Sequence, residues 1–357
     1  MTTQVLDQKK AEKFAEKMIG VINGGALALM TSIGHRTGLF DVMAELPPAS
    51  SRQIAEAAGL NERYVREWLA AMVVGRIIDY DAREATYTLP QEHAAALTRS
   101  ATPNNIAATT QFISLLGSVE DQIVESFYKG GGVHYSAFPR FHEVMAEESN
   151  QTVVAALIDH ILPLAPGLVD RLAQGIEVLD VGCGSGNALI LMARVFPKSR
   201  FTGFDFSEEA IARARKEAER IGLSNIRFEA KDVATLNGGS RFGLITAFDA
   251  IHDQASPALV LKAVSNALAE DGVFLMQDIA GSSHLDKDID HPAAPFLYTV
   301  SCMHCMTVSL AQNGAGLGTM WGRETASRML AEAGFTRLEV KQLPHDIMNN
   351  YFIARKG

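Results

Sequence analysis

The sequence predicts an α/β protein in which a parallel sheet with helices on both faces follows a smaller helical domain. The chain has 357 residues, enough for two domains at about 100–200 residues each. From residue 176 onward, short apolar segments alternate with amphipathic helical segments, an order typical of parallel sheets. Residues 1–100 instead show helical periodicity, first over residues 11–30, and then one short alternating hairpin.

The composition excludes several classes of protein. Apolar residues make up 47% of the chain and charged residues 20%, as in globular proteins, so a largely disordered chain is excluded. The formal net charge is −9, and none of the segments 1–100, 101–175 and 176–357 is net basic. Because non-specific binding to nucleic acid or to an anionic membrane relies on Lys and Arg, we expect neither partner.

The chain begins with a charged, polar segment that has no apolar core, so no targeting signal is expected. Two stretches have almost no charged residues, 18–36 and 292–322, but polar residues and glycines interrupt both, and neither predicts a membrane helix. Three cysteines are few for a secreted protein. We therefore expect a soluble, cytoplasmic protein.

Residues 1–100 predict a winged helix. Segments 51–60 and 61–72 read as two helices across a short turn that contains Gly59, which is a helix-turn-helix. Two alternating segments, 77–80 and 85–89, follow as a hairpin that forms the wing.

The charge of the second of these helices bears on whether the winged helix binds DNA. Its charged residues are Glu62, Arg63, Arg66 and Glu67, and their charges cancel. A neutral recognition helix favours packing or dimerisation over DNA binding.

Residues 101–175 predict a helical connector interrupted by three glycines, 130–132. The segment that follows, 133–145, is rich in aromatic residues. Consecutive glycines suit a mobile joint, which would make this segment a lid over a substrate. A tight linker between domains explains the glycines equally well. The candidate lid residues are Tyr135, Phe138, Phe141 and His142.

Residues 176–357 predict seven strands with helices between them. Strands are expected near residues 177–181, 200–205, 226–231, 242–248 and 272–278, with two closing strands near 335–342 and 350–354. Helices are expected near residues 186–196, 208–221, 257–269 and 323–334.

The most informative segment joins the first of these strands to the first helix. The strand ends at Asp180, and glycines follow at 182, 184 and 186. Glycines let the backbone approach a ligand closely at the carboxyl edge of a sheet. The spacing is G-x-G-x-G, whereas the G-x-G-x-x-G of dinucleotide-binding enzymes has one more residue.

Asp180 with Gly182, Gly184 and Gly186 resembles the first motif of the class I S-adenosylmethionine-dependent methyltransferases. Three later positions agree in order. Asp205 ends the second strand, where an acid would bind ribose hydroxyls. Asp232 and Val233 end the third strand, where this family holds adenine. The segment 249–253 follows the fourth strand, where the family places the reacting centre.

The resemblance implies a Rossmann-like seven-stranded methyltransferase domain preceded by the winged helix, with S-adenosyl-L-methionine as cofactor. This cofactor has no pyrophosphate but carries a sulfonium and an ammonium, which acidic groups can face. A nicotinamide-dependent dehydrogenase is the disfavoured alternative. Cys183 reads as a small apolar residue in a tight turn rather than a reactive thiol. The cofactor-binding residues that the resemblance implies are Asp180, Gly182, Cys183, Gly184, Gly186, Asp205, Phe206, Asp232, Val233, Phe248 and Asp249.

His252 is the candidate catalytic residue. An acceptor hydroxyl must lose a proton during methyl transfer, which calls for a positioned base. His252 and Asp253 resemble the His-Asp pair of small-molecule O-methyltransferases of the plant and bacterial natural-product type. These enzymes also carry an N-terminal winged helix for dimerisation. The chain departs from their pattern at Gln254, where an aromatic residue is common, and the sequence does not identify the carboxylates that usually orient the base.

The uncharged stretch 292–322 could line an apolar acceptor pocket, with Phe296 and Met303 as candidates, or form a buried subunit interface. Its Cys302, His304 and Cys305 crowd one short run, too few ligands for zinc, so no metal is expected.

We therefore expect a homodimeric methyltransferase acting on a small apolar or aromatic acceptor, at a hydroxyl. The first alternative is a winged-helix transcriptional regulator whose methyltransferase-like domain senses a ligand. The second is a catalytically silent domain that binds the cofactor only.

Overall fold

The computed structural model describes residues 6–236 and 239–357, which form two compact units. The first unit ends at Ser114 and the second begins at Leu115. The first extends past residue 100 because Ala107 of the short helix α6 (Ile106–Thr109) is fully buried in its core. The other elements of the first unit are α1 (Gln8–Thr37), α2 (Leu39–Glu45), α3 (Ser51–Ala58), α4 (Glu62–Val74), β1 (Asp79–Asp81), β2 (Thr86–Thr88) and α5 (Gln91–Leu97).

The first unit is the winged helix that the sequence predicts. Ser50 and Gln53 form a reciprocal capping box at the start of α3, and Gly59 ends that helix in the left-handed region, at φ 66°. Asn61 caps α4 through the N–H of Arg63. The strands β1 and β2 pair antiparallel as the wing.

Helix α1 differs between its two halves. Its C-terminal half packs on α4, where Trp68 donates a 2.8 Å hydrogen bond to the carbonyl of Met30. A Cβ at Gly34 would lie 2.5 Å from the ring of Trp68 and 2.7 Å from that of Phe40, so this contact requires glycine. The N-terminal half instead exposes large apolar side chains to solvent within its unit: Phe14, Met18, Ile19, Val21 and Ile22.

The second unit is built on the predicted seven-stranded sheet. The strand order is β5-β4-β3-β6-β7-β9-β8. The first five strands in that order are parallel, and β9 pairs antiparallel with both β7 and β8. The strands are β3 (Glu177–Val181), β4 (Arg200–Asp205), β5 (Ile226–Ala230), β6 (Phe242–Phe248), β7 (Leu268–Ile279), β8 (Arg337–Leu343) and β9 (Asp346–Arg355).

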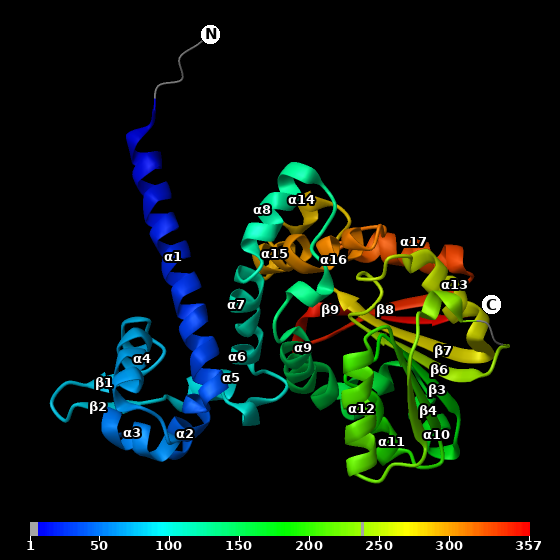
Figure 1. Cartoon of the computed structure of the whole chain (residues 1–357), viewed down its shortest axis with the longest axis horizontal. Helices are drawn as coiled ribbons and strands as arrows, with labels where there is room; N and C mark the ends of the chain where they lie inside the picture. Colours follow the sequence, from blue (N-terminus) through cyan, green and yellow to red (C-terminus); the bar gives the residue numbers. More distant parts are fainter. Residues whose placement is uncertain (1–5, 237–238) are drawn as a thin grey trace. The chain divides into compact units, whose positions relative to one another are not determined.

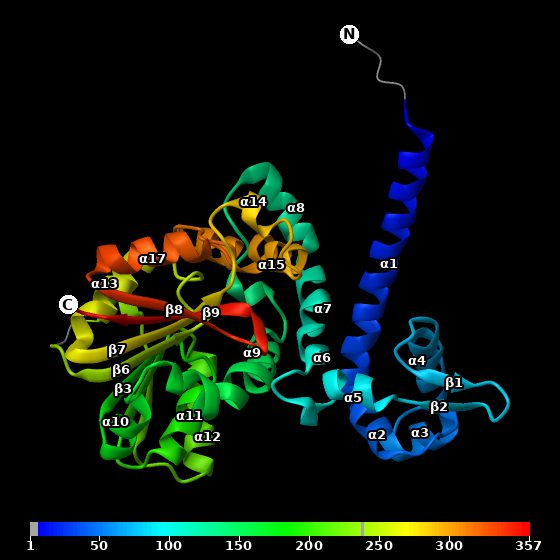
Figure 2. The same ribbon diagram turned by 180° about the vertical axis from the view of Figure 1, so that it is seen from behind.

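Helices cover both faces of this sheet, on opposite sides in Figure 1 and in the reverse view of Figure 2. Side chains alternate along β3, so Val178 packs with one helical layer and Leu179 with the other. One layer comprises α10 (Leu168–Gln174), α11 (Asn187–Val195) and α12 (Glu208–Arg220). The other comprises α13 (Pro257–Ala267) and α17 (Gly322–Ala333). The faces of both layers that pack on the sheet are apolar and buried.

Further helices of the second unit lie beside that edge. They are α8 (Glu120–Lys129), α9 (Phe141–Ser149), α14 (Leu285–Asp288), α15 (Ala294–Val300) and α16 (Met306–Ala311), with π-helical turns at Asn150–Val154, Leu157–Ile161 and Ser301–Cys305. Helix α7 (Gln111–Gly117) contains the boundary between the units.

Two helical stretches among the described residues, Gln8–Thr37 and Ala294–Ala311, are long and apolar enough to cross a membrane, by length and composition alone. Much of the second is buried within its unit, as in a core helix of a globular domain, whereas the first is mostly exposed. That neither crosses a membrane stays a prediction from the sequence.

The three glycines at 130–132 divide into two kinds. Gly130 and Gly131 have positive φ angles of 70° and 77°, and a Cβ on either would meet nothing within 4 Å. Gly132 packs on α16, where a Cβ would lie 1.9 Å from the carbonyl oxygen of Thr307. The next residue, Val133, donates a 2.8 Å hydrogen bond to the hydroxyl of Thr307. The aromatic segment therefore begins at a point fixed to α16.

Candidate functional site

The glycine loop after β3 lies at the carboxyl edge of the sheet. Gly182 has φ 69°, and a Cβ there would lie 2.5 Å from the Cβ of Ala250. Gly186 has φ 74°, and a Cβ there would lie 2.5 Å from the ring of Phe228. Both the backbone conformation and the close packing thus require glycine at these two positions.

Asp205 fastens this loop to the end of β4. Its carboxylate accepts hydrogen bonds from the N–H of Gly184 (2.9 Å) and the N–H of Ser207 (2.8 Å). Burial raises the pKa of this carboxyl, and those hydrogen bonds oppose the rise. The loop is therefore held in place by the residue that the sequence predicts to bind ribose.

Asp180 lies within the sheet, only 2% exposed, and accepts a 2.7 Å hydrogen bond from the hydroxyl of Thr246 on β6. Burial raises its pKa to about 7. Burial also raises the pKa of Cys183 well above its usual value, so this side chain remains a thiol near neutral pH.

Two neighbouring cavities follow this edge of the sheet. The main cleft is formed by the glycine loop, the end of β6 and helix α9, and the adjoining cavity lies over the ends of β4 and β5. Gly182, Asp205 and Phe206 line both. The predicted cofactor residues in the main cleft are Asp180, Gly182, Cys183, Gly184, Gly186, Asp205, Phe206, Phe248 and Asp249. Asp232 and Val233 line the adjoining cavity. The structure thus brings all eleven together along one continuous surface.

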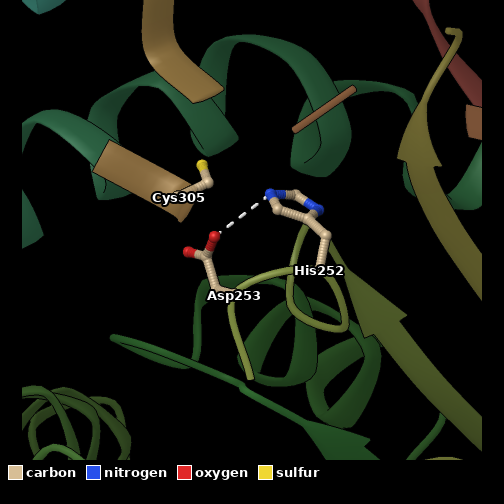
Figure 3. A group of neighbouring side chains, drawn as sticks. All are labelled: His252, Asp253 and Cys305. Carbon is tan, nitrogen blue, oxygen red and sulfur yellow. Dashed lines mark ion pairs between the residues drawn. The ribbon is translucent and has the colours of Figure 1, made fainter. Parts of the chain in front are cut away.

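His252 lies just beyond the end of β6, between the carboxylates of Asp253 and Asp278. Figure 3 shows its contact with Asp253. Its Nδ1 lies 2.8 Å from Asp278 Oδ1, and its Nε2 lies 3.2 Å from Asp253 Oδ1. Burial acts to lower the pKa of His252, but the charges of Asp278 and Asp253 raise it well above its usual value. His252 is only 3% exposed and does not line the main cleft, whereas Asp253 does.

Asp278 is the orienting carboxylate that the sequence did not identify. It lies near the end of β7 and also accepts hydrogen bonds from the indole N–H of Trp321 (3.0 Å) and the N–H of Ile279 (2.9 Å). A signal existed, because β6 and β7 were predicted as strands and their carboxyl ends meet at the same edge in a parallel sheet. An acid at the end of the strand 272–278 was therefore a candidate partner for His252.

Cys305 lies beside His252 and Asp253 in Figure 3. Its Sγ, one oxygen of Asp253 and one ring nitrogen of His252 lie within 4.8 Å of one another. The set offers three metal-ligand types, but both ring nitrogens of His252 already contact carboxylates. Burial raises the pKa of the Cys305 thiol to about 12, so without a metal it stays protonated.

An aromatic cluster closes the side of the main cleft opposite the sheet. It comprises Tyr135, Phe138, Phe141, His142 and His304, and all but Phe138 and His304 line the cleft. The rings of Phe141 and His304 stack, 4.0 Å apart with 6° between their planes. Burial lowers the pKa of His304 to about 4, so its imidazole is neutral near pH 7. His142 contacts the hydroxyl of Ser207 through Nε2, at 3.2 Å.

That Phe296 and Met303 line the acceptor pocket stays a prediction. Neither lines the main cleft or the adjoining cavity, whereas Val308 and Gln312 of the same stretch line the main cleft. Residues four apart share one face of a helix, so α16 and its C-terminal end turn 308 and 312 toward the cleft. The sequence showed an apolar stretch but not which helical face points inward.

Comparisons with known proteins agree with this description. Residues 25–99 match the Rv2258c-like winged HTH domain, and residues 172–334 match a methyltransferase domain. Among curated relatives, (S)-coclaurine N-methyltransferase of Papaver somniferum is 28% identical over 109 residues, which are 30% of this chain and 31% of the relative. Ubiquinone biosynthesis O-methyltransferase of Actinobacillus pleuropneumoniae is 31% identical over 130 residues, 34% of this chain and 54% of the relative. The first curated relatives are thus matched over only about a third of their length.

Solved structures match over nearly the whole chain. A putative O-methyltransferase from Nostoc punctiforme has a TM-score of 0.70 at 18% identity and covers 95% of this chain and 98% of its own. Human N-acetylserotonin methyltransferase has a TM-score of 0.68 at 17% identity and covers 100% and 99%. At these identities the likeness establishes the fold. Residues 25–99 therefore belong to a winged helix-turn-helix domain and residues 172–334 to a methyltransferase domain, within a fold that extends over nearly the whole chain.

Proposed function

We propose that this protein transfers the methyl group of S-adenosylmethionine to a hydroxyl of a small apolar or aromatic acceptor. The observation that carries this proposal is the main cleft, where the cofactor residues adjoin a carboxylate–histidine–carboxylate chain at Asp253, His252 and Asp278. When bound, the cofactor supplies an activated methyl group, so the protein mainly has to align the acceptor and manage its proton.

The residues present fit this cofactor. In this proposal Asp232 and Val233 hold the adenine in the adjoining cavity that they line, and Asp205 accepts hydrogen bonds from the ribose hydroxyls. Gly182 lets the loop pack closely against the segment after β6, because any side chain there would overlap Ala250. The main cleft is lined by acids and, among the described residues, by no lysine or arginine, which suits a cation rather than a pyrophosphate.

In this proposal, Asp253 and His252 together accept the proton that the acceptor hydroxyl loses. Asp253 faces the cleft, and His252 lies behind it with its other nitrogen on Asp278. The two carboxylates favour the imidazolium form, so His252 in its neutral form is a strong proton acceptor. Asp278 fixes the ring orientation, since it is itself held by Trp321.

The class of acceptor follows from the opposite side of the cleft. Tyr135 and Phe141 present aromatic faces there, and Val308 adds an apolar contact. An aromatic or apolar molecule packs on such surfaces, while the surrounding acids disfavour an anionic acceptor. We take residues 133–145 as the lid over this molecule.

We further propose a division of labour along the chain. Residues 1–100 pair two subunits through the winged helix and the exposed apolar face of α1, residues 101–175 form connector and lid, and residues 176–357 bind the cofactor. DNA binding is not favoured, because Arg63 pairs with Glu67 and Arg66 with Glu62 on α4 itself. We place the homodimer in the cytoplasm, without a nucleic-acid or membrane partner and without a resident metal.

Two measurements test the proposal. Calorimetry should show binding of S-adenosylhomocysteine at micromolar strength or tighter, and absence of binding would refute the proposed function. A panel of phenols, aliphatic alcohols and aromatic amines incubated with methyl-labelled cofactor should then transfer label to hydroxyls. Label on amines alone would shift the acceptor atom to nitrogen, and no transfer to any member would favour a silent cofactor-binding domain.

A further inference from the structure

Glu148 is the acidic residue of the main cleft that no sequence motif indicated. It lies near the C-terminal end of α9 and enters the cleft from the helical side, facing the sheet edge that carries the glycine loop. Its neighbours Met145 and Ser149 line the same cleft, so one face of α9 is turned toward it.

Asp249 meets this side of the cleft from the end of β6. It has a positive φ of 48°, a left-handed conformation that aspartate tolerates better than most residues. One of its carboxylate oxygens, Oδ1, is shielded from solvent and has no hydrogen-bond partner among the described residues. A shielded, unpartnered carboxylate oxygen in a ligand cleft is a position that a hydrogen-bond donor would stabilise.

The positions of the two cavities indicate which part of the cofactor would lie beside Glu148 and Asp249. The adjoining cavity contains Asp232 and Val233, the adenine positions, and Asp205 lies where the two cavities meet. With adenine in the adjoining cavity and ribose at Asp205, the rest of the molecule extends into the main cleft. That remainder is the sulfonium and the amino-acid part, whose ammonium carries three donors.

The negative charge of this cleft also favours a cationic ligand. The acidic lining residues are Glu148, Asp180, Asp205, Asp249 and Asp253, and the lining includes no lysine or arginine among the described residues. Burial, with the charges of Asp249 and Asp346, raises the pKa of Glu148 to about 8. Burial, with the charge of Asp278, raises that of Asp249 to about 7. An ammonium between the two carboxylates would let both ionise.

We propose that Glu148, together with Asp249, binds the α-ammonium group of the cofactor's amino-acid part. The inference rests on the proposed function, since it requires the cofactor to occupy the cleft. Glu148 then serves as a cofactor-binding residue supplied by the helical segment before the methyltransferase motifs, so α9 contributes to cofactor affinity as well as to the lid. An ammonium group on the acceptor is the other source of the same chemistry.

The test compares two ligands that differ at the amino-acid part. S-adenosylhomocysteine carries the ammonium, and 5′-methylthioadenosine lacks the whole amino-acid part. Calorimetry would be run with both ligands on the wild type, Glu148→Gln and Glu217→Gln. The last makes the same chemical change on the exposed surface of α12. We expect Glu148→Gln to weaken the binding of S-adenosylhomocysteine about 10- to 100-fold, as for the loss of a charge-assisted hydrogen bond. The binding of 5′-methylthioadenosine should weaken less than twofold. Glu217→Gln should change neither.

Each outcome decides the inference. If Glu148→Gln leaves both affinities unchanged, the ammonium site is refuted and an acceptor amine becomes the candidate occupant. If both ligands weaken equally in a variant with an unchanged melting curve, Glu148 acts on the cleft as a whole and the inference is also wrong. If Glu148→Gln does not fold, Asp249→Asn carries the same comparison, because asparagine tolerates the positive φ at that position. If the wild type binds neither ligand, the proposed function itself fails, which is a distinct result.

Discussion

The two walls of the main cleft differ in how the sequence specifies them. The sheet wall consists of the glycine loop and the ends of β4 and β6. Its glycines and acidic residues lie at or just after the ends of strands, so their positions can be read from the local sequence. The helical wall consists of residues 133–149 and residues 308–312, which are about 160 residues apart in the chain and meet only in the fold. We expect the sheet wall to determine the proton chemistry and most of the cofactor site, and the helical wall to determine the acceptor and to add Glu148 to the cofactor site.

The largest effect is expected at the sheet wall, at His252. The change His252→Ala removes the proton acceptor and should lower kcat about 10²- to 10⁴-fold, the usual contribution of general base catalysis. The affinity for S-adenosylhomocysteine should stay within twofold, because His252 does not line the cleft. His160→Ala, at an exposed histidine, is the control. Full turnover by His252→Ala with bound cofactor would rule out the assigned role.

A second change at the same wall separates binding from chemistry. Gly182→Val combines an unfavourable positive φ with overlap against Ala250, so the loop must move. We expect the affinity for S-adenosylhomocysteine to fall by about 100-fold, a cost of roughly 3 kcal/mol. Gly239→Ala, where a Cβ meets nothing within 4 Å, should bind normally. Unchanged binding by Gly182→Val would show that the cofactor does not approach this loop.

The helical wall should respond in a different parameter. Phe141→Leu keeps much of the side-chain volume but removes the ring that stacks on His304. The acceptor KM should rise about 3- to 10-fold, since an aromatic contact of this kind contributes roughly 0.5–1.5 kcal/mol. The affinity for S-adenosylhomocysteine should change less than twofold. If instead cofactor affinity falls as much as in Gly182→Val, the two walls do not divide their roles.

The smallest expected effect is a displacement of the pH profile. His252 accepts a proton only when neutral, and the carboxylates beside it raise its pKa, so kcat should rise with pH along a limb above pH 6.5. In Asp253→Asn one of these charges is gone, the pKa of His252 falls, and the limb should move to lower pH by about one unit. A pH–rate profile of both proteins measures this. A limb that stays in place would mean that Asp253 does not act on His252.

The same contrast explains what could be predicted from the sequence. The order of strands and helices and the positions of Asp180, Asp205 and Asp232 followed from local spacing, because a parallel sheet brings successive strand ends to one edge. The orienting role of Asp278 was missed, although its place at a strand end was predictable. Glu148, Val308 and Gln312 could not be found, because their contribution depends on how α9 and α16 rotate against the sheet. The place of Phe296 and Met303 depends on the same rotation and stays a prediction.

The hydrogen bonds that Asp205 accepts bear on how fast the cofactor binds. The Asp205 carboxylate accepts hydrogen bonds from the N–H groups of Gly184 and Ser207, so contacts within the protein itself fix the conformation of the glycine loop. Cofactor association then requires no ordering of the loop, and little conformational entropy is lost at that step. Capture of the cofactor should therefore follow single-exponential kinetics whose rate increases linearly with concentration, without the plateau that a preceding loop rearrangement would impose.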